Sequence, residues 1–449
     1  MTIDAAPRVV SPVAATEPQR LRGATAIIAV AIIGSLYGQR FVIPGMRVSA
    51  GFLILVLLAI IAVALNVGRI QVGRALVALA LAGSASALAL VSGLWTPFTP
   101  SLESLLLLIV AWMPFAVIAR GRAPWKPVRW DVVFFWCALP AAAAVVLQFA
   151  LQFTGVGFLD PVMDLPANIR WTDTEYSVSY EYVWGTGLQK PNGFFFAEPS
   201  LAAQFMCLGV FAALSYKPVW AILFVAAVAL TASGTGTIAL GVGLVFAFIA
   251  AGPILRIAMV LFTAVLIPIV LSIPLIGDAF LGRGTDLLNE GDGSGNARFV
   301  DPFTVVAWAV QRFPQVVLTG FGPGTADLAS VASGNPLANP TFVSKAILEY
   351  GVPFALTLTF VIAFAILSAR GVTLANRVVL VTMIFFLSGA LIQGPTGLLL
   401  WSALFAAPSR YDVLDHTDPP LWRTMPWSRT RTEPLFAAGS VGGVSPSYR

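Results

Sequence analysis

The sequence predicts an all-α polytopic membrane protein with about twelve transmembrane helices, in a range of about ten to twelve. Hydrophobic residues make up 58% of the 449 residues and charged residues only 10%, whereas soluble domains contain about 25% charged residues. The hydrophobic residues fall in runs long enough to cross the ~30 Å apolar core of a bilayer. Two long polar segments interrupt these runs, which predicts two large loops outside the bilayer.

Each apolar run is predicted to form one transmembrane helix. The first follows Arg8, Arg20 and Arg22 and has no small-residue cleavage site, which indicates a retained span and not a cleaved signal peptide. In an alternative interpretation, residues 377–407 form one interrupted segment, and the chain then ends on the other side of the membrane. The predicted helices cover the ranges 24–39, 48–66, 75–94, 102–119, 131–153, 198–216, 218–232, 235–251, 254–275, 343–369, 377–392 and 393–407.

Basic residues are distributed unevenly between the segments that connect these helices. With the N-terminus inside, 18 of the 26 Lys and Arg residues fall on the inner side, and 14 of the 21 Asp and Glu residues fall on the outer side. The positive-inside rule predicts this orientation. The chain is thus expected to contain a cytoplasmic N-terminal tail (1–23), a membrane domain (24–407) and a cytoplasmic C-terminal tail (408–449) whose Pro- and Ser-rich composition predicts disorder.

Two outer segments, about 154–197 and about 276–342, are longer than ordinary helix connections. Loops of this length are usually functional or disordered. The first interleaves aromatic and acidic residues, among them Tyr182 and Trp184. Aromatic rings stack on sugar faces and carboxylates accept hydrogen bonds from sugar hydroxyls, so this loop is a candidate glycan-binding surface. The alternative is an aromatic belt at the membrane interface.

The second outer loop is predicted to contain a short amphipathic helix. Asp301 and Pro302 form a helix-starting pair at the N-cap and first helical positions, and Pro314 ends the segment. We expect this helix to lie along the outer membrane surface. Its apolar stripe consists of Phe303, Val306, Val310 and Phe313.

Several classes of function are disfavoured by what the chain lacks. The only histidine, His416, lies in the C-terminal tail, and both cysteines fall within predicted spans, so neither a metal site nor a disulfide framework is expected. Basic residues are scattered, which argues against nucleic-acid binding. Ionisable residues near the spans fall at their outer ends, whereas an ion pathway needs them at mid-depth. A site at the outer interface is therefore expected.

Short motifs with a characteristic order occupy residues 190–351. They are Lys190-Pro-Asn-Gly-Phe-Phe-Phe-Ala-Glu198-Pro-Ser, Asn296-Ala-Arg298, Trp308, Arg312-Phe-Pro, Gly320-Phe-Gly-Pro-Gly324 and Lys345-Ala-Ile-Leu-Glu349-Tyr-Gly351. In order and spacing these motifs resemble the O-antigen polymerase and O-antigen ligase family of bacterial envelope glycosyltransferases. The predicted topology of the whole chain resembles that family too.

This resemblance implies transfer of a glycan from undecaprenyl diphosphate to an acceptor sugar hydroxyl, without a cofactor. It implies a multi-pass protein of the bacterial cytoplasmic (inner) membrane whose active site faces the periplasm. The implied partners are an undecaprenyl-diphosphate-linked oligosaccharide, membrane lipids, a chain-length regulator and other polysaccharide assembly proteins. Ligases of the family carry a histidine in the large outer loop, where this chain has Asn339-Pro. A polymerase is therefore favoured, and a ligase or a transporter or flippase remains the alternative.

A lipid diphosphate leaving group needs cations, which Arg supplies with forked geometry. Arg298 is the first candidate and Lys190 the second; an ion pair with Asp301 or a lipid headgroup is the alternative for Arg298. Arg312 would lie about 21 Å from Arg298 along one straight helix, so it is expected to bind headgroups or another part of the substrate. Backbone N–H groups of Gly322 and Gly324 are candidates to cradle phosphate.

The attacking hydroxyl needs a base, and Glu198 and Glu349 are the candidates, with Asp327 third. Each carboxylate also has an ordinary structural explanation. Glu198 precedes Pro199 at a helix start, where an acid is favourable, and Glu349 lies four residues after Lys345 and can pair with it. Each outer loop is expected to meet the bilayer beside one basic group and one carboxylate, Lys190 with Glu198 and Arg298 with Glu349.

Overall fold

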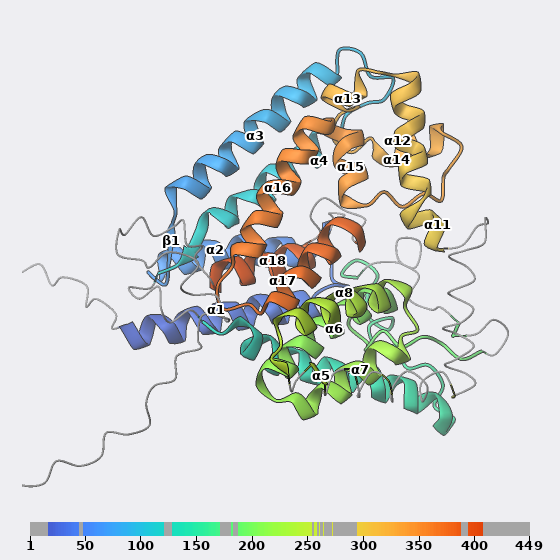
Figure 1. Cartoon of the computed structure of the whole chain (residues 1–449). Helices are drawn as coiled ribbons and strands as arrows, with labels where there is room; N and C mark the ends of the chain where they lie inside the picture. The colour runs from blue at the N-terminus through green and yellow to red at the C-terminus, as the bar shows by residue number, and fades with distance from the viewer. Residues whose placement is uncertain are drawn as a thin grey trace, which may run out of the picture. The chain divides into compact units, whose positions relative to one another are not determined.

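The computed structural model describes most of the chain between residues 17 and 406. The chain divides into two compact units, Met1–Asp412 and Val413–Arg449, and every described residue belongs to the first. That unit is mostly helical, with sixteen α-helices among the described residues (Figure 1). The described ranges are 17–44, 48–120, 128–170, 181–182, 187–253, 294–387 and 394–406, with five isolated positions between 256 and 272.

Three helices are long and apolar enough to cross a membrane: Val72–Ser92, Trp130–Thr154 and Pro199–Tyr216. Further apolar helices of 10–17 residues lie at most of the other predicted positions. This architecture is consistent with the predicted all-α membrane protein. The predicted helix 254–275 and the C-terminal tail fall outside the described residues, apart from isolated positions in the former.

The first five helices follow the first five apolar runs. Ser49 and Ser101 start two of them, since each side chain accepts a hydrogen bond from a backbone N–H of the first turn. The first helix begins earlier than predicted and includes part of the predicted N-terminal tail. The helices are α1 (Glu17–Tyr37), α2 (Ala50–Ala64), α3 (Val72–Ser92), α4 (Leu102–Trp112) and α5 (Trp130–Leu151), and 3-10 turns extend α4 and α5 over Met113–Ala116 and Gln152–Thr154.

A two-stranded antiparallel sheet departs from the all-α prediction. Strand β1 (Gly68–Ile70) pairs with β2 (Val117–Ala119), with Arg69 opposite Ile118. The β-branched residues of β2 are buried, which favours an extended conformation there. The sheet ties the connection after α2 to the segment after α4.

Helix α6 (Pro199–Tyr216) is enclosed over most of its length, because residues 202–213 are all buried. It packs against α5, α7 (Ala221–Leu230) and α8 (Gly234–Ala250). Glycines permit the close approach: a Cβ on Gly236 would lie 2.3 Å from the Cβ of Ala203. Small residues at such crossings are typical of helices that pack in lipid. The start of α6 is thereby held at a fixed place.

The described part of the second long loop folds into short helices around a small core of its own. They are α11 (Ser294–Phe299), α12 (Asp301–Arg312), α13 (Val316–Thr319), α14 (Ala326–Ala332) and α15 (Phe342–Tyr350). Helix α12 begins one residue earlier than predicted, since Val300 and not Asp301 is the N-cap. Its fully buried positions are Pro302, Val305 and Ala309, and Phe303 is exposed. The predicted stripe is thus shifted, because the helix packs on α14 and α15.

The predicted helix 343–369 is two helices, α15 and α16 (Val352–Ser368). Gly351 separates them with φ 83° and ψ 167°, a conformation that is essentially restricted to glycine. Pro353 then stands in the first turn of α16, where it has no N–H to lose. Lys345 and Glu349 therefore belong to the short loop helix and not to the apolar span.

Helices α17 (Leu374–Thr382) and α18 (Gly394–Ala406) run in opposite directions. Helix α17 starts beside Asp131, continues as a π-helical turn over Met383–Leu387, and reaches Phe342 through Phe385. Helix α18 starts beside Ser35, which donates to the Pro395 carbonyl, and ends where Trp130 donates to Ser402. This arrangement favours two separate segments over one interrupted segment.

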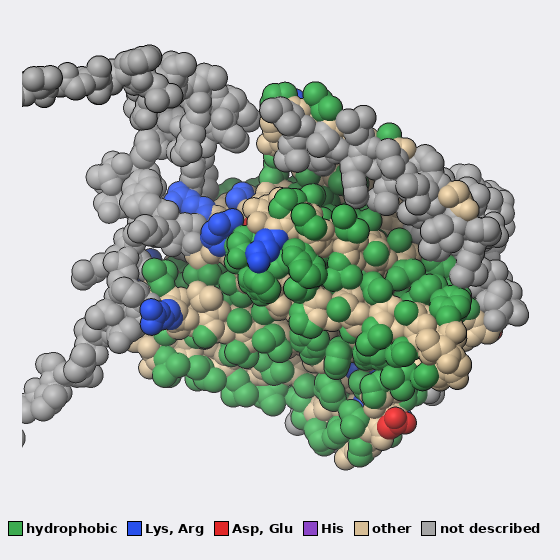
Figure 2. Space-filling model, turned by 90° about the horizontal axis from the view of Figure 1, so that it is seen from below, with side chains coloured by type: hydrophobic (Ala, Val, Ile, Leu, Met, Phe, Trp, Pro, Cys, Tyr) green, Lys and Arg blue, Asp and Glu red, His purple; other side chains and the backbone are tan. Residues whose placement is uncertain are grey.

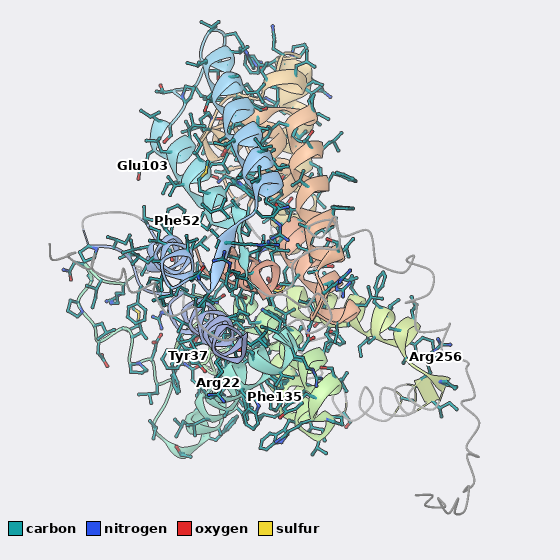
Figure 3. All side chains as sticks on the ribbon, turned by 90° about the vertical axis from the view of Figure 1, so that its left-hand side faces the viewer. Arg22, Tyr37, Phe52, Glu103, Phe135 and Arg256 are labelled. Atoms are coloured by element: carbon teal, nitrogen blue, oxygen red, sulfur yellow. The ribbon has the colours of Figure 1, made fainter. Side chains whose placement is uncertain are left out.

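The surface carries the pattern expected in lipid. Figure 2 shows a face covered mostly by hydrophobic side chains, with Lys and Arg gathered at one end of it. Figure 3 shows α1 and α2 nearly end-on, with α3 and α16 rising beside them. Apolar residues such as Leu76 on α3 and Phe360 on α16 are exposed. Exposed apolar helix faces of this extent suit contact with acyl chains.

Candidate functional site

Glu198 and Arg298 form an ion pair that joins the two long loops. Arg298 Nη2 lies 3.2 Å from Glu198 Oε1, although the residues are 100 positions apart in the chain. Both side chains are partly accessible, at 20% and 18% exposure. The Ser200 hydroxyl also donates to Glu198 Oε1. Since arginine has five N–H donors and this contact uses one, the guanidinium retains donors for an anionic ligand.

The start of α6 fixes Glu198. It is the N-cap residue, with extended backbone at φ −150° and ψ 159°, and Pro199 follows in the first turn. The carboxylate therefore stands at the positive end of a helix dipole, where an acidic residue is favourable. Arg298 stands in the last turn of α11, where a cation is favourable for the same reason. The backbone N–H of Asn339 donates to the Ala297 carbonyl at 2.7 Å and secures α11.

The ion pairs of the structure differ from the expected grouping of the charges by loop. Glu198 pairs with Arg298, and Glu349 pairs with Lys345, four residues earlier on the same helix. An Arg298–Glu349 pair and the alternative Arg298–Asp301 pair are not among the described ion pairs. The two carboxylates therefore belong to different surroundings, and only Glu198 lies beside the phosphate-binding candidate.

Lys190 is buried in the turn that leads to Glu198. Asn192 organises this turn, since its backbone N–H and that of Gly193 both donate to Gln148 Oε1 at 2.8 Å. The Asn192 side chain in turn bonds to Gln148 and to the Phe196 carbonyl. Lys190 is therefore less accessible than Arg298.

Glu349 is almost fully buried, with 3% of its side chain exposed. Burial raises the pKa of its carboxyl to about 7, while Lys345, 3.9 Å away, and the backbone N–H groups of Gly324 and Ala326 lower it. Its Oε1 atom has no hydrogen-bond partner among the described residues. Lys345 also lies 4.0 Å from Asp327, whose side chain is 78% exposed. Glu349 is thus a candidate acid or base that a sugar would reach only after rearrangement.

The glycine turn predicted to cradle phosphate is engaged within the protein. The N–H of Gly322 donates to the Glu349 carbonyl at 2.9 Å, and that of Gly324 faces the Glu349 carboxyl. Gly322 and Gly324 have φ of 103° and 73°, and a Cβ on either would collide with residues 92–104. These glycines therefore allow the loop to dock, and their N–H groups are used by Glu349.

Tyr182 and Arg312 have surroundings other than the Glu198–Arg298 pair. Tyr182 is 4% exposed, packs against Phe149 and donates to the Ala229 carbonyl, so its ring does not face a sugar in this structure. Trp184 lies outside the described residues. Arg312 is exposed at the end of α12.

Sequence reasoning missed several polar contacts close to this site or opposite it. Gln204, one turn after Ser200 on α6, donates to Thr235 in the first turn of α8, and the Thr235 hydroxyl also bonds to that of the N-cap residue Ser233. Asp131 accepts hydrogen bonds from Thr373 and Asn376 and joins α5 to α17. The Ser233-Gly-Thr-Gly stretch between two apolar runs is the sequence signal that could have found the first contact. Asp131 at the start of an apolar run could have been noticed.

A partly accessible guanidinium beside a carboxylate and the Ser200 hydroxyl can hold a phosphate and orient a hydroxyl nucleophile. Among the residues that the structure describes, no group of three or more His, Cys, Asp or Glu side chains could hold a metal ion. Comparison of the chain with protein-family models, with curated proteins and with solved structures finds no match.

Proposed function

We propose that this protein is a membrane-embedded polysaccharide polymerase of the bacterial envelope. It transfers a glycan from undecaprenyl diphosphate to a sugar hydroxyl of a second lipid-linked repeat unit, at the periplasmic face of the inner membrane. The observation that carries the proposal is the partly accessible Arg298–Glu198 pair between the two long loops. The order of motifs over residues 190–351 supports the same assignment.

The chemistry assigns a role to each partner. The acceptor hydroxyl attacks the anomeric carbon, the bond from that carbon to the diphosphate oxygen breaks, and the hydroxyl proton passes to Glu198. Arg298 donates to the diphosphate and stabilises the charge that grows on the leaving oxygen. Glu198 is hydrogen-bonded to Arg298. A donor phosphate on Arg298 and an acceptor hydroxyl on Glu198 would therefore lie next to each other.

We place the site at the outer face of the membrane on two grounds. One is the distribution of basic residues between the connecting segments, and the other is a set of loop contacts at each end of the helices. Arginine-containing connections meet at one end of the helices, where Arg120 N–H donates to Val67 and Asp131 binds Thr373. The two long loops meet the opposite helix ends, where Ser101 N–H donates to Pro323 of the second loop and Val42 N–H donates to Ile169 of the first. The positive-inside rule then makes the arginine-containing end cytoplasmic. We infer twelve spans with both tails inside.

Deletion of the gene, followed by analysis of lipid-linked glycans, tests the proposal. Accumulation of single repeat units on undecaprenyl diphosphate is expected for a polymerase. Full-length polymer that stays on its carrier would instead assign a ligase that moves glycan to a lipid or protein acceptor. Undisturbed glycans at the outer face would contradict both transferases. Repeat units trapped on the cytoplasmic side would also contradict both and would point to a flippase.

Replacement of Arg298 by Ala tests the site itself. We expect polymer formation to fall by about 100-fold or more, which is typical for loss of an electrostatic contact to a developing charge. The matched variant is Arg312→Ala, in which the removed guanidinium is exposed at the end of α12 and the loss should be only severalfold. Polymer formation is measured in membranes that contain equal amounts of each variant. Equal losses in both variants would contradict the assignment of Arg298.

A further inference from the structure

A buried ion pair links the segment after α1 to the first long loop. Arg40 Nη1 lies 2.5 Å from Asp160 Oδ1, and the two side chains are only 2% and 7% exposed. Charges so completely removed from water are costly unless they are paired, and loss of one partner leaves the other unpaired. Neither residue is part of the Glu198–Arg298 site, yet the pair is the most deeply buried ion pair of the described chain.

The same arginine holds the backbone that leads into Glu198. Arg40 Nη1 also donates to the Phe194 carbonyl at 2.9 Å. Its neighbour Gln39 accepts a hydrogen bond from the Ala197 N–H at 3.4 Å. Tyr37, labelled on α1 in Figure 3, packs edge-on against the ring of Phe195 at 4.9 Å. The end of α1 and its next three residues thus contact three of the four residues that precede Glu198.

The backbone held in this way is strained. Phe194 has φ 66°, directly after Gly193 at φ 63°. A left-handed conformation is unfavourable for a residue with a Cβ, and it persists only where surrounding contacts enforce it. Here the Phe194 N–H donates to Asn192 Oδ1 at 3.1 Å while its carbonyl accepts from Arg40. Without the second contact, the turn can relax and redirect the residues that follow.

We propose that Arg40, held by Asp160, is a positioning residue that fixes Glu198 opposite Arg298. Arg40 touches neither Glu198 nor the proposed substrate and acts through Phe194 and the three residues after it. The effect on catalysis rests on the proposed function, whereas the effect on geometry does not. If the Arg40–Asp160 pair only stabilised the fold, its loss would lower the amount of folded protein. The placement of Glu198 opposite Arg298 would then be unchanged in the molecules that remain folded.

The geometry is tested by cross-linking in the full-length chain in membranes. Cys137 and Cys207 are replaced by Ala, and the probes Glu198→Cys and Arg298→Cys are joined with a short bifunctional thiol reagent. Addition of Arg40→Gln should lower the cross-linked fraction at least threefold. Arg40→Lys should retain it, since an ammonium group keeps the charge and several donors. An unchanged fraction with Arg40→Gln would overturn the proposal.

A second variant covers the case in which Arg40→Gln does not accumulate. Asp160→Asn removes the charge that holds Arg40 and leaves Arg40 in place, and it should lower the cross-linked fraction in the same direction. If the protein with Asp160→Asn accumulates normally and cross-links as before, the pair does not position Glu198.

Kinetics on lipid-linked repeat units supply the functional measurement. Arg40→Gln should lower kcat at least tenfold and change KM for the donor by less than twofold, and Arg40→Lys should restore most of kcat. If wild-type protein makes no polymer but the cross-link responds to Arg40→Gln, the proposed function fails and the positioning role stands. If polymer forms and neither kcat nor the cross-link responds, the positioning role fails alone.

Discussion

Burial gives Glu349 properties that Glu198 does not have, although both carboxylates stand near helix ends in the same motif series. Glu198 is partly accessible and binds Arg298 and Ser200. Glu349 is enclosed by the glycine turn, and its burial raises the pKa of the carboxyl to about 7. A carboxyl with a raised pKa binds its proton more tightly in the folded state than in the unfolded state. This difference has a measurable consequence for stability.

The substitution Glu349→Gln should stabilise the protein relative to wild type by an amount that depends on pH. In the unfolded chain the carboxyl ionises near its ordinary value of 4.5, and in the fold near 7, so the folded state loses stability as pH rises between these values. Above pH 7 the full cost is roughly 3 kcal/mol. The variant should therefore unfold at a higher temperature than wild type at pH 8 and at nearly the same temperature at pH 5, measured on purified protein in detergent.

An exposed glutamate provides the control for this measurement. Glu103→Gln makes the same chemical change in the exposed first turn of α4. Its effect on the unfolding temperature should be small at both pH values. If Glu349→Gln gave no larger gain at pH 8 than Glu103→Gln, the raised pKa of Glu349 would be disproved.

At the scale of elements, Gly351 decides where the loop ends and the apolar helix α16 begins. Its φ of 83° and ψ of 167° are accessible only to glycine, and an added Cβ would lie 2.5 Å from the backbone of Leu318. Gly351→Ala should therefore cost about 3 kcal/mol or more, from strain and collision together. A fall in the unfolding temperature of the purified protein measures this cost.

Gly334 is a matched control in the same loop. Its φ is 82°, but nothing lies within 4 Å of the position that an added methyl group would take, so Gly334→Ala adds backbone strain without a collision. Its cost should stay near 1–2 kcal/mol, roughly the penalty of a left-handed residue alone. Equal costs at the two glycines would show that the close contact with Leu318 does not exist.

Most helices were predictable because an apolar run of about 20 residues has few other ways to satisfy its backbone in lipid. The break at Gly351 was not predicted, although Gly351 followed by Pro353 is a typical helix stop and start. The ion pairs depend on folding across long sequence distances. Nothing local to Arg298 distinguishes Glu198, 100 residues away, from Asp301, three residues away.

At the scale of the whole molecule, the helices are held together by contacts that differ along their length. A small residue allows α6 and α8 to approach closely in the apolar part, where a Cβ on Gly243 would lie 2.2 Å from the ring of Phe211. Polar side chains join the helices near their ends, with Arg40–Asp160 on one side and Asp131–Asn376 on the other. In lipid, where apolar burial gives no preference between a neighbouring helix and an acyl chain, such contacts decide the arrangement.

The two ends of the molecule should therefore be distinguishable by labelling. In a chain with Cys137 and Cys207 replaced by Ala, Asp327→Cys places a thiol on an exposed side chain of the second loop, and Ser440→Cys places one in the C-terminal tail. A membrane-impermeant maleimide should label position 327 in intact cells, and position 440 only after permeabilisation, since α18 ends beside Trp130 at the arginine-containing end. External labelling of position 440 would instead mean that residues 377–407 cross the membrane once. Protection of position 327 would move the Glu198–Arg298 pair to the cytoplasmic side, where an undecaprenyl-linked glycan that has already been exported could not reach it.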